Sequence, residues 1–570
     1  MAEEKLAAGR TFLLGTVFIT GMSIMAIEMS ASRLVAPFFG TSLIVWTNII
    51  GLIMMSLSAG YYIGGRLSDR RPEWPLLYKL ILGSGIGMFI IPFIANPVMS
   101  YAASGTVGTF LGSLIAVVLL FIVPFTLLGM VAPFVIKLAA TRIDDVGNTA
   151  GSIYALSTVG SIIGTYLPAL LFVPWLGTRR TILFFATALI FIGVAGLIRG
   201  QKGKAAVSKA AAIVPLIAFA LAVIGPPGDV KAIVARGRTK LLETESLYNY
   251  IQIQQRVIPM KGGKTRKRNL LVLNEGFAVH SVHDPDGPYS PFVGSVWDYF
   301  GICGIPLAGK KSGSMDVCIV GLAAGTISKQ MFTVYSPSFD VKIDGVEIDP
   351  EIIRLGKEHF GMTEKGLNAV AEDGRTFLQR TKKKYDLIVT DAYRQPYIPF
   401  HLTTKEYFAA KAAHLKENGI MAINVGTLSD ETELFQRIVT TVNSQFPHVY
   451  YIPVSFKGAL FTNFVVIGAK RALDPVALLH PAKNDLLLKS RNKKGWSVVR
   501  GVLRKARNNW KTFTARKGVL PLTDDKAPVE FLTDWLILKY IISGKAQAAM
   551  SHELGKRAGS SKSSILKEPK

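Results

Sequence analysis

The sequence is poor in cysteine and in acidic residues, and its total share of charged residues is low. Two cysteines in 570 residues, Cys303 and Cys318, exclude a disulfide scaffold and a cysteine-rich zinc or iron–sulfur site. The eight histidines show no metal-ligand spacing, so no metal is expected. Charged residues make up 18% and apolar residues 49% of the chain, whereas soluble proteins average about 25% charged. This balance argues against an ordinary cytosolic enzyme and against a disordered chain.

The shortage of acids leaves a large positive charge. With 65 Lys and Arg against 39 Asp and Glu, the formal net charge is +26, which calls for lipid head groups, nucleic acid or an acidic substrate as a partner. Residues 483–517 hold twelve of these cations and a single acid, Asp485. Val499, Val502 and Leu503 interleave with them at partly helical spacing. We interpret the segment as a basic amphipathic helix that lies on a lipid surface, with a merely solvated face as the alternative; no motif supports nucleic acid.

Long apolar runs dominate the first 225 residues. A helix of about 20 apolar residues crosses the hydrocarbon of a bilayer. Seven runs of roughly that length predict that residues 1–225 form a multi-pass bundle in the cell (inner) membrane. The runs are Thr11–Met29, Leu43–Gly65, Leu76–Ala95, Phe110–Met130, Thr149–Val173, Thr181–Ile198 and Ala210–Ile224. Three G-x-x-x-G steps begin at Gly60, Gly83 and Gly160. Such steps let helix backbones approach closely in lipid, and we expect them to pack the bundle.

The distribution of Lys and Arg predicts the orientation of the bundle. With the amino terminus inside, the inner segments hold twelve cations and the outer loops hold three, as the positive-inside rule requires. Seven crossings then place everything after residue 225 outside, whereas one missed crossing would place it inside. The side of the membrane that the rest of the chain faces is therefore left undecided.

After a Gly/Pro-rich and basic connector at 226–240, the pattern becomes that of a soluble α/β chain. Short strand-like runs at 247–257, 269–273 and 277–282 predict a small β subdomain within 226–300. From residue 316 apolar strands alternate with helices, which predicts a parallel sheet covered on both faces over 301–480. The strands are expected at 316–321, 341–348, 385–391, 419–425 and 463–469. The basic segment follows over 481–550, and residues 551–570 have a disordered composition.

Glycines and acids stand where these strands end. Ligands of such sheets bind outside the carboxyl ends of the strands, and the residues expected there are Gly321, Gly325, Glu347, Asp349, Asp373, Gly374 and Asp391. Glu347 comes 22 residues after Gly325, a spacing that suits an acid on two ribose hydroxyls. Thr326 takes the place of the third glycine of a dinucleotide site, and there is no P-loop. The set favours a single adenosine ligand, although Asp349 before Pro350 also suits a helix cap.

The same residues carry a resemblance to a known family. Glu245, Ser246 and Tyr248, the run NEGFAVHS at 274–281, and then VGLAAGT, VEIDP, EDG, YDLIVTDAY and LTTKEYF resemble, in content and order, the spermidine synthases of polyamine biosynthesis. The runs at 33–51, 60–70 and 521–530 resemble a subgroup with a multi-pass bundle fused in front. The resemblance implies aminopropyl transfer by a Rossmann-like, methyltransferase-type domain with a small amino-terminal β subdomain. It implies that Gly321, Gly325, Glu347, Asp373 and Gly374 hold decarboxylated S-adenosylmethionine or a relative, and that Tyr248 and His280 line the acceptor side.

Two departures from the family pattern affect the acceptor. Ala324 stands where the synthases carry an acid in the glycine loop, and the family's D-x-x-D is replaced by Asp391-Ala-Tyr-Arg394. Asp391 remains as the best proton acceptor, but Arg394 would repel a polyamine by about 4 kcal/mol for two like charges at 4 Å. We therefore expect an anionic or zwitterionic small-molecule acceptor to be favoured.

Three hypotheses follow for the function. The first is a membrane-anchored transferase that moves an aminopropyl-type group from an adenosyl sulfonium to an amine or another acceptor. The second is a non-catalytic membrane protein that senses a nucleoside or a polyamine. The third is a methyltransferase or lyase acting on intact S-adenosylmethionine. The lipid bilayer is the expected macromolecular partner, and a homo-oligomer is compatible with the sequence.

Overall fold

The structure is a computed structural model. It describes residues 2–39, 43–104, 108–140, 146–200, 234, 237–260, 262–274, 278–287, 290–304, 313–393, 397–454, 462–475, 479 and 493–542. The chain divides into two compact units, which are described separately. The first comprises Met1–Ile233 and Glu243–Tyr250, and the second comprises Val234–Leu242 and Ile251–Lys570.

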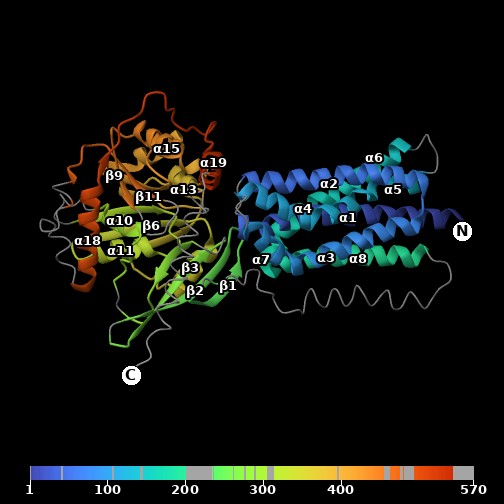
Figure 1. The fold of residues 1–570 in the computed structure, drawn as a ribbon, viewed down its shortest axis with the longest axis horizontal. Helices are drawn as coiled ribbons and strands as arrows, with labels where there is room; N and C mark the ends of the chain where they lie inside the picture. The colour runs from blue at the N-terminus through green and yellow to red at the C-terminus, as the bar shows by residue number, and fades with distance from the viewer. Residues whose placement is uncertain are drawn as a thin grey trace, which may run out of the picture. The chain divides into compact units, whose positions relative to one another are not determined.

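The first unit is a bundle of helices (Figure 1). Its elements are α1 (Ala2–Phe39), α2 (Leu43–Arg70), α3 (Trp74–Ser104), α4 (Gly108–Gly129), α5 (Val131–Ala139), α6 (Val146–Leu167), η2 (Pro168–Phe172), α7 (Val173–Leu176) and α8 (Thr178–Gly200). Among the described residues, six helical stretches are long and apolar enough to cross a membrane, with α4 joined to α5 and α6 joined to η2. Six of the seven predicted spans are thus confirmed as long apolar helices. The seventh, at 210–224, lies outside the described residues.

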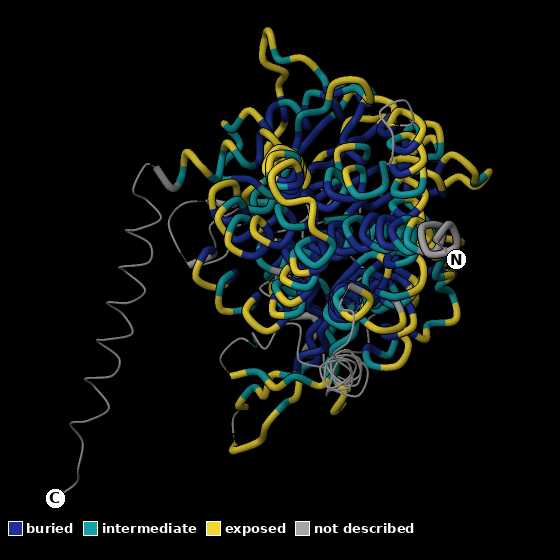
Figure 2. The backbone as a smooth tube through the Cα atoms, turned by 90° about the vertical axis from the view of Figure 1, so that its right-hand side faces the viewer, coloured by how far each residue is buried: buried dark blue, intermediate teal, exposed yellow. Residues whose placement is uncertain are grey.

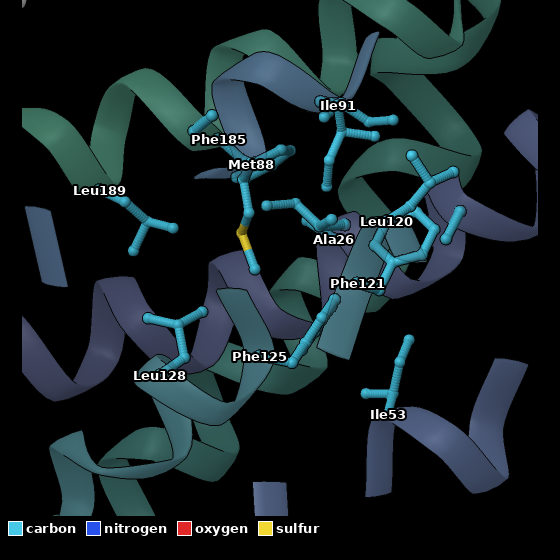
Figure 3. Close-up of a cluster of buried hydrophobic side chains, with 14 of the residues drawn as sticks. Ala26, Ile53, Met88, Ile91, Leu120, Phe121, Phe125, Leu128, Phe185 and Leu189 are labelled. Atoms are coloured by element: carbon cyan, nitrogen blue, oxygen red, sulfur yellow. The ribbon is translucent and has the colours of Figure 1, made fainter. Parts of the chain in front are cut away.

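Small residues and large apolar side chains pack the bundle together. A side chain at Gly60 or Gly64 would collide with backbone or Cβ atoms near the end of α4, and one at Gly160 or Gly164 with the backbone of α1. These two G-x-x-x-G steps therefore pack helices, as expected. The bundle core lies between the helices, where Met88 of α3, Phe121 and Phe125 of α4, and Phe185 of α8 converge (Figure 3).

Contacts at the two ends of the bundle give the path of the chain. At one end, the start of α3 meets the end of α8, where Trp74 Nε1 donates to the Gly196 carbonyl at 2.9 Å. At the opposite end, where α8 begins, the Glu245 carboxylate accepts from Thr178 N and Oγ1, each at 2.8 Å. Gly196, near the end of α8, and Glu245 therefore lie at opposite ends of the bundle.

The second unit begins with a four-stranded sheet in the order β1-β2-β3-β4. The strands are β1 (Arg238–Glu245), β2 (Tyr250–Pro259), β3 (Thr265–Leu273) and β4 (Val279–His283). β2 and β4 both run antiparallel to β3. The three predicted strand-like runs correspond to β2, β3 and β4, whereas β1 was not predicted. It begins at Arg238, within the connector expected at 226–240.

An eight-stranded sheet follows, in the order β12-β10-β11-β9-β8-β5-β6-β7. Its strands are β5 (Ser314–Val320), β6 (Asp340–Glu347), β7 (Leu367–Ala371), β8 (Tyr385–Thr390), β9 (Leu415–Thr427), β10 (His448–Val454), β11 (Thr462–Ala469) and β12 (Lys511–Thr512). The helices are α10 (Val296–Ile302), α11 (Thr326–Tyr335), α12 (Pro350–His359), α13 (Gly374–Arg380), η4 (Phe400–Leu402), α14 (Lys405–His414), α15 (Glu433–Asn443), α18 (Lys493–Asn509) and α19 (Val529–Ile542). This is the predicted Rossmann-like, methyltransferase-type fold.

Helices cover both faces of this sheet. Val317 and Ile319 of β5 pack into one apolar core with α10, α11 and α18, while Cys318 and Val320 pack into another with α13, α14 and α15. Successive strand residues point to opposite faces, so a strand buried on both faces reads as one apolar run. Exposed residues lie at the periphery of the traced chain and buried ones inside it (Figure 2).

The sheet is mixed, which corrects the expectation of a purely parallel one. β7, β6, β5, β8 and β9 are parallel, but β11, the strand expected at 463–469, runs antiparallel to β9 and to β10. The reason lies in the connection from Val454 to Thr462. Its few residues suffice for a hairpin-like return, whereas a parallel crossover needs a dozen or more.

The basic helix α18 differs from its interpretation as a lipid-surface element. Val499, Val502, Leu503 and Ala506 are buried in the core beside β10 and α10. The apolar face is thus covered by the domain itself, and the solvated-face alternative fits the described part of the helix. α19 was not predicted. Three of its residues, Val529, Leu532 and Thr533, are buried, while Phe531 and Trp535 remain exposed.

Candidate active site

A cavity of about 410 Å³ opens beside the carboxyl ends of β5 and β8 in the second unit. Its floor comes from Gly321, Leu322 and Ala323 after β5 and from Asp391 and Tyr393 after β8. The four strands β1 to β4 supply one wall, and Trp297 of α10 supplies another. The cavity therefore occupies the edge at which ligands of such sheets bind.

The glycine turn after β5 brings the two strand ends together. Gly321 has φ +86°, and a Cβ there would lie 2.6 Å from the Asp391 carbonyl oxygen. Asp391 in turn donates its N–H to the Val320 carbonyl at 2.9 Å. Gly325 also has a left-handed φ of +85° and precedes the first residue of α11. Only glycine adopts the turn without strain, so Gly321 fixes where Asp391 sits.

The carboxylate of Asp391 is held by two side-chain donors. Trp297 Nε1 donates to Oδ2 at 3.0 Å and Asn424 Nδ2 donates to Oδ1 at 2.9 Å. Burial raises the pKa of Asp391 to about 6, and the two hydrogen bonds oppose that shift. A carboxylate with a pKa just below neutrality is still ionised at pH 7 and is well matched to take a proton.

Asn424 and Tyr393 complete this side of the cavity. Tyr393 Oη donates to the Asn424 carbonyl at 3.1 Å and accepts from Gly426 N at 2.6 Å. Asn424 is 5% exposed, and its Oδ1 has no hydrogen-bond partner among the residues that the structure describes. A buried acceptor without a partner is costly, so this amide oxygen keeps a hydrogen-bonding capacity that the described residues do not use.

Glu347 ends β6 at the same edge of the sheet but does not line the cavity. It is 8% exposed, and its carboxylate accepts from Ala323 N at 2.9 Å and from Asp349 N at 3.3 Å. Burial raises the pKa of Glu347 to about 7, against the effect of these backbone donors. Asp349 caps α12, since its Oδ1 accepts from Glu351 N at 3.0 Å. The capping alternative for Asp349 is therefore observed.

Asp373 and Gly374 begin α13. Asp373 Oδ1 accepts from the N–H groups of Arg375 and Thr376, at 3.0 and 2.9 Å, and Oδ2 lies 3.1 Å from His401 Nε2. The hydrogen bond to His401 is the largest influence that lowers the pKa of Asp373 to about 2. A Cβ at Gly374 would collide with Val320, so this glycine lets α13 approach β5. Both residues have structural roles beside the predicted adenosine role.

Of the remaining predicted residues, one lines the cavity and the others do not or lie outside the described residues. His280 lines the cavity, and burial lowers its pKa to about 4, which keeps it neutral at pH 7. Tyr248 belongs to the first unit and is not among the cavity-lining residues. Ala324 is 3% exposed within an apolar cluster and donates its N–H to Ser281 Oγ at 3.0 Å. Arg394 lies outside the described residues.

Several cavity residues were missed by the sequence analysis. Asn424 stands near the end of the predicted strand 419–425, so its position at the ligand edge could have been recognised. Trp297 is distant from Asp391 in the sequence, and no local pattern predicts the contact between them. Arg238, Arg256 and Arg268 also line the cavity, although they read as ordinary surface cations in the sequence. Within the described residues, no group of three or more His, Cys, Asp or Glu is placed to hold a metal.

Comparison with known proteins agrees with this arrangement. Residues 302–474 match the family described as "Spermine/spermidine synthase domain". Residues 302–474 of the second unit thus match a spermidine synthase-family domain. The matched residues contain β5 to β11 and therefore the glycine turn, Asp391 and Asn424, while the small β subdomain and α10 up to Gly301 precede them.

Three relatives illustrate the similarity. A "Probable polyamine aminopropyl transferase" of Bifidobacterium longum is 30% identical over 36% of this chain and 42% of its own length. An "N-terminal histidine N-methyltransferase" of Emericella nidulans is 30% identical over 32% of this chain and 33% of its own. "Polyamine aminopropyltransferase 2" of Aquifex aeolicus is 22% identical over 80% of this chain and 87% of its own. The chain thus spans less than half of the first two relatives, and the long third match extends beyond the family domain.

Proposed function

We propose that the chain is a membrane-anchored transferase that binds an adenosyl sulfonium and transfers its aminopropyl-type group to an acceptor in the cavity. The observation that carries the proposal is the cavity itself, where the glycine turn after β5 meets a buried, hydrogen-bonded Asp391. The family domain and the names of the two aminopropyltransferase relatives support the choice of group. The six apolar helices support the membrane anchor.

The residues of the cavity suit the transfer step. The lone pair of an acceptor nitrogen forms a bond to the carbon beside the sulfonium, and the carbon–sulfur bond breaks to leave the thioether methylthioadenosine. The nitrogen must lose a proton for this attack, and Asp391 accepts it. Asn424 Oδ1, which has no partner among the described residues, would orient the remaining N–H. Glu347 would accept from the ribose hydroxyls, with Asp373 and Gly374 toward the adenine.

Methyl transfer from intact S-adenosylmethionine is the second candidate. One relative is named as a histidine N-methyltransferase, and the three arginines that line the cavity favour a ligand with a carboxylate. The intact sulfonium has that carboxylate, and the decarboxylated one lacks it. The step would be the same displacement, except that the methyl carbon is attacked and S-adenosylhomocysteine leaves.

The membrane side follows from the path of the chain. Gly196, near the end of α8, and Glu245 lie at opposite ends of the bundle, and the predicted seventh span would connect these two ends. With the amino terminus inside, as the Lys and Arg count indicates, Glu243–Tyr250 lies at the outer end. We infer that the soluble unit faces outward, and the adenosyl sulfonium must then be supplied on that side.

The test is a product assay on the purified full chain in detergent. The protein is incubated with decarboxylated or with intact S-adenosylmethionine and a set of amines, and the released nucleoside is identified by mass spectrometry. Methylthioadenosine from the decarboxylated form supports aminopropyl transfer, and S-adenosylhomocysteine from the intact form supports methyl transfer. Binding of either sulfonium without release of a nucleoside would instead support the sensor hypothesis.

A further inference from the structure

The wall of the cavity formed by the small β sheet is unusually rich in positive charge. Arg238 of β1, Arg256 of β2 and Arg268 of β3 all line the cavity. Arg256 and Arg268 are direct partners in the β2–β3 register. Side chains directly opposite one another on antiparallel strands lie on the same face, with Cβ atoms about 5 Å apart, and like charges there repel.

Few carboxylates neutralise these arginines. Asp284 receives Arg268 through Nε and Nη2, at 2.7 and 3.1 Å, and is shared with Arg266. Arg238 Nη1 donates to Gln254 Oε1, a neutral acceptor, at 3.2 Å. No hydrogen bond or ion pair of Arg256 is found in the part of the chain that the structure describes.

The other acids near the cavity are already engaged. Asp391 accepts from Trp297 and Asn424. The fully buried Asp298 accepts from Val293 N, Gly294 N and Gln330 Nε2. Repulsion between the arginines also lowers their pKa values. Burial, together with Arg266 and Arg256, lowers the pKa of Arg268 to about 10, and burial with Arg256 lowers that of Arg238. This side of the cavity therefore carries an excess of positive charge that an anionic ligand would relieve.

We propose that Arg238, Arg256 and Arg268 form an anion subsite of the cavity and bind a carboxylate or phosphate group of a ligand. The subsite deepens the proposed function, on which the choice of ligands below rests. Arginine suits this role because its planar guanidinium donates in pairs to carboxylate and phosphate oxygens. Across the same cavity, Asp391 and Asn424 Oδ1 present acceptors to an amine. The ligands that fit best therefore carry an amine and an anion together, and a dication such as putrescine fits poorly.

Two ligands could supply the anion. One is the adenosyl sulfonium, through the carboxylate that intact S-adenosylmethionine has and its decarboxylated form lacks. The other is the acceptor, through an acidic group of its own. The two sources are separated by asking which ligand loses affinity when the subsite is removed.

The first arm measures the adenosyl ligands by calorimetry on the full chain in detergent. The variant is Arg256→Gln, which leaves no described partner unpaired, and the matched control is Lys267→Gln. Lys267 is an exposed residue of β3, next to Arg268 and therefore on the opposite face. If the cosubstrate supplies the anion, R256Q weakens intact S-adenosylmethionine about tenfold or more. Methylthioadenosine and decarboxylated S-adenosylmethionine keep their affinities, and K267Q changes none of the three.

The second arm saturates the protein with methylthioadenosine and titrates γ-aminobutyrate or putrescine. These two amines have similar lengths, but only the first carries a carboxylate. If the acceptor supplies the anion, γ-aminobutyrate binds more tightly than putrescine, and R256Q weakens it about tenfold while leaving putrescine unchanged or improved.

Inorganic phosphate is titrated without any nucleoside, so that the subsite is tested even if no adenosyl compound binds. Failure of methylthioadenosine to bind the wild type contradicts the proposed function alone. The anion subsite is refuted if R256Q binds intact S-adenosylmethionine, γ-aminobutyrate and phosphate with the same affinities as the wild type.

Discussion

The indole nitrogen of Trp297 lies 3.0 Å from Oδ2 of Asp391, and Trp297 is only 8% exposed. The two residues are far apart in the sequence, and α10 brings the indole to the end of β8. The hydrogen bond orients the carboxylate in the cavity and favours its ionised form. It therefore links a packing residue of α10 to the proton acceptor of the proposed reaction.

Asp391→Asn should remove turnover and leave ligand binding. The amide cannot accept a proton from the attacking nitrogen, and loss of a general base costs about 10²- to 10⁴-fold in rate. The rate of nucleoside release measures the first effect, and calorimetry with methylthioadenosine measures the second. A variant that turns over at the wild-type rate would show that Asp391 is not the base.

The pH profile of the reaction should follow Asp391. Its pKa is raised to about 6 by burial, so activity should fall as the pH drops through about 6 and the base becomes protonated. Trp297→Phe removes a donor that lowers this pKa, so the acidic limb should move upward, by about one pH unit. If W297F lowers activity but the acidic limb of its pH profile does not move, Trp297 has a packing role alone.

Gly321→Ala should reduce activity in addition to the stability that any alanine with a left-handed φ loses. The new Cβ would meet the Asp391 carbonyl oxygen at 2.6 Å, in addition to the strain of a φ of +86°. Gly518→Ala is the matched control, because Gly518 has φ +85° and nothing within 4 Å of the same position. Both should lose about 1 kcal/mol of stability from the backbone, but only G321A should also lose activity. If G321A and G518A changed activity equally, the turn at Gly321 would have no specific role in the active site.

Much of this arrangement was predictable from the sequence, for a definable reason. A strand buried on both faces is a continuous apolar run, so β5, β6, β8, β9 and β11 could be located, and with them Gly321, Glu347 and Asp391. What the sequence did not supply was the direction of β11, which depends on a short connection, and the burial of the apolar face of α18. Trp297 and the arginine wall come to the cavity from distant segments. Cross-strand register brings Arg256 opposite Arg268, and no single stretch of sequence contains that relationship.

Lys411 should make the stability of the second unit depend on pH. It is fully buried in α14, beside the rings of Tyr407 and Phe408 at 4.9 and 5.5 Å. Its Nζ has no hydrogen-bond partner among the described residues, and burial lowers its pKa from 10.5 to about 7. Between these values the unfolded chain binds the extra proton, so stability should rise with pH from about 7 to 10.

Lys411→Met should abolish that rise and stabilise the protein at pH 7 by roughly 1–3 kcal/mol, because the buried ammonium is lost. Thermal unfolding of the full chain at several pH values measures both effects. Lys405→Met, at the exposed start of the same helix, is the control and should leave the pH dependence intact. A wild-type stability that is flat from pH 7 to 10 would contradict this account of Lys411.

The orientation of the chain is accessible to thiol labelling, because Cys303 and Cys318 are both buried. Single cysteines replace exposed residues: Lys517→Cys in the second unit, and Arg71→Cys between α2 and α3. A maleimide that cannot cross membranes should label K517C in intact spheroplasts and R71C only after lysis. The reverse pattern would place the soluble unit inside and refute the outward orientation.

The central claim is that the sheet edge beyond β5 and β6 holds an adenosyl group, and calorimetry with Glu347→Gln tests it most directly. Methylthioadenosine is titrated into the full chain, into E347Q and into Glu351→Gln, a control at the next helix. We expect the wild type and E351Q to bind alike and E347Q to bind about ten- to a hundredfold more weakly, because one of the two acceptor oxygens for the ribose hydroxyls is replaced by an amide donor. Equal affinity in all three proteins would contradict the assignment of this edge as an adenosyl site.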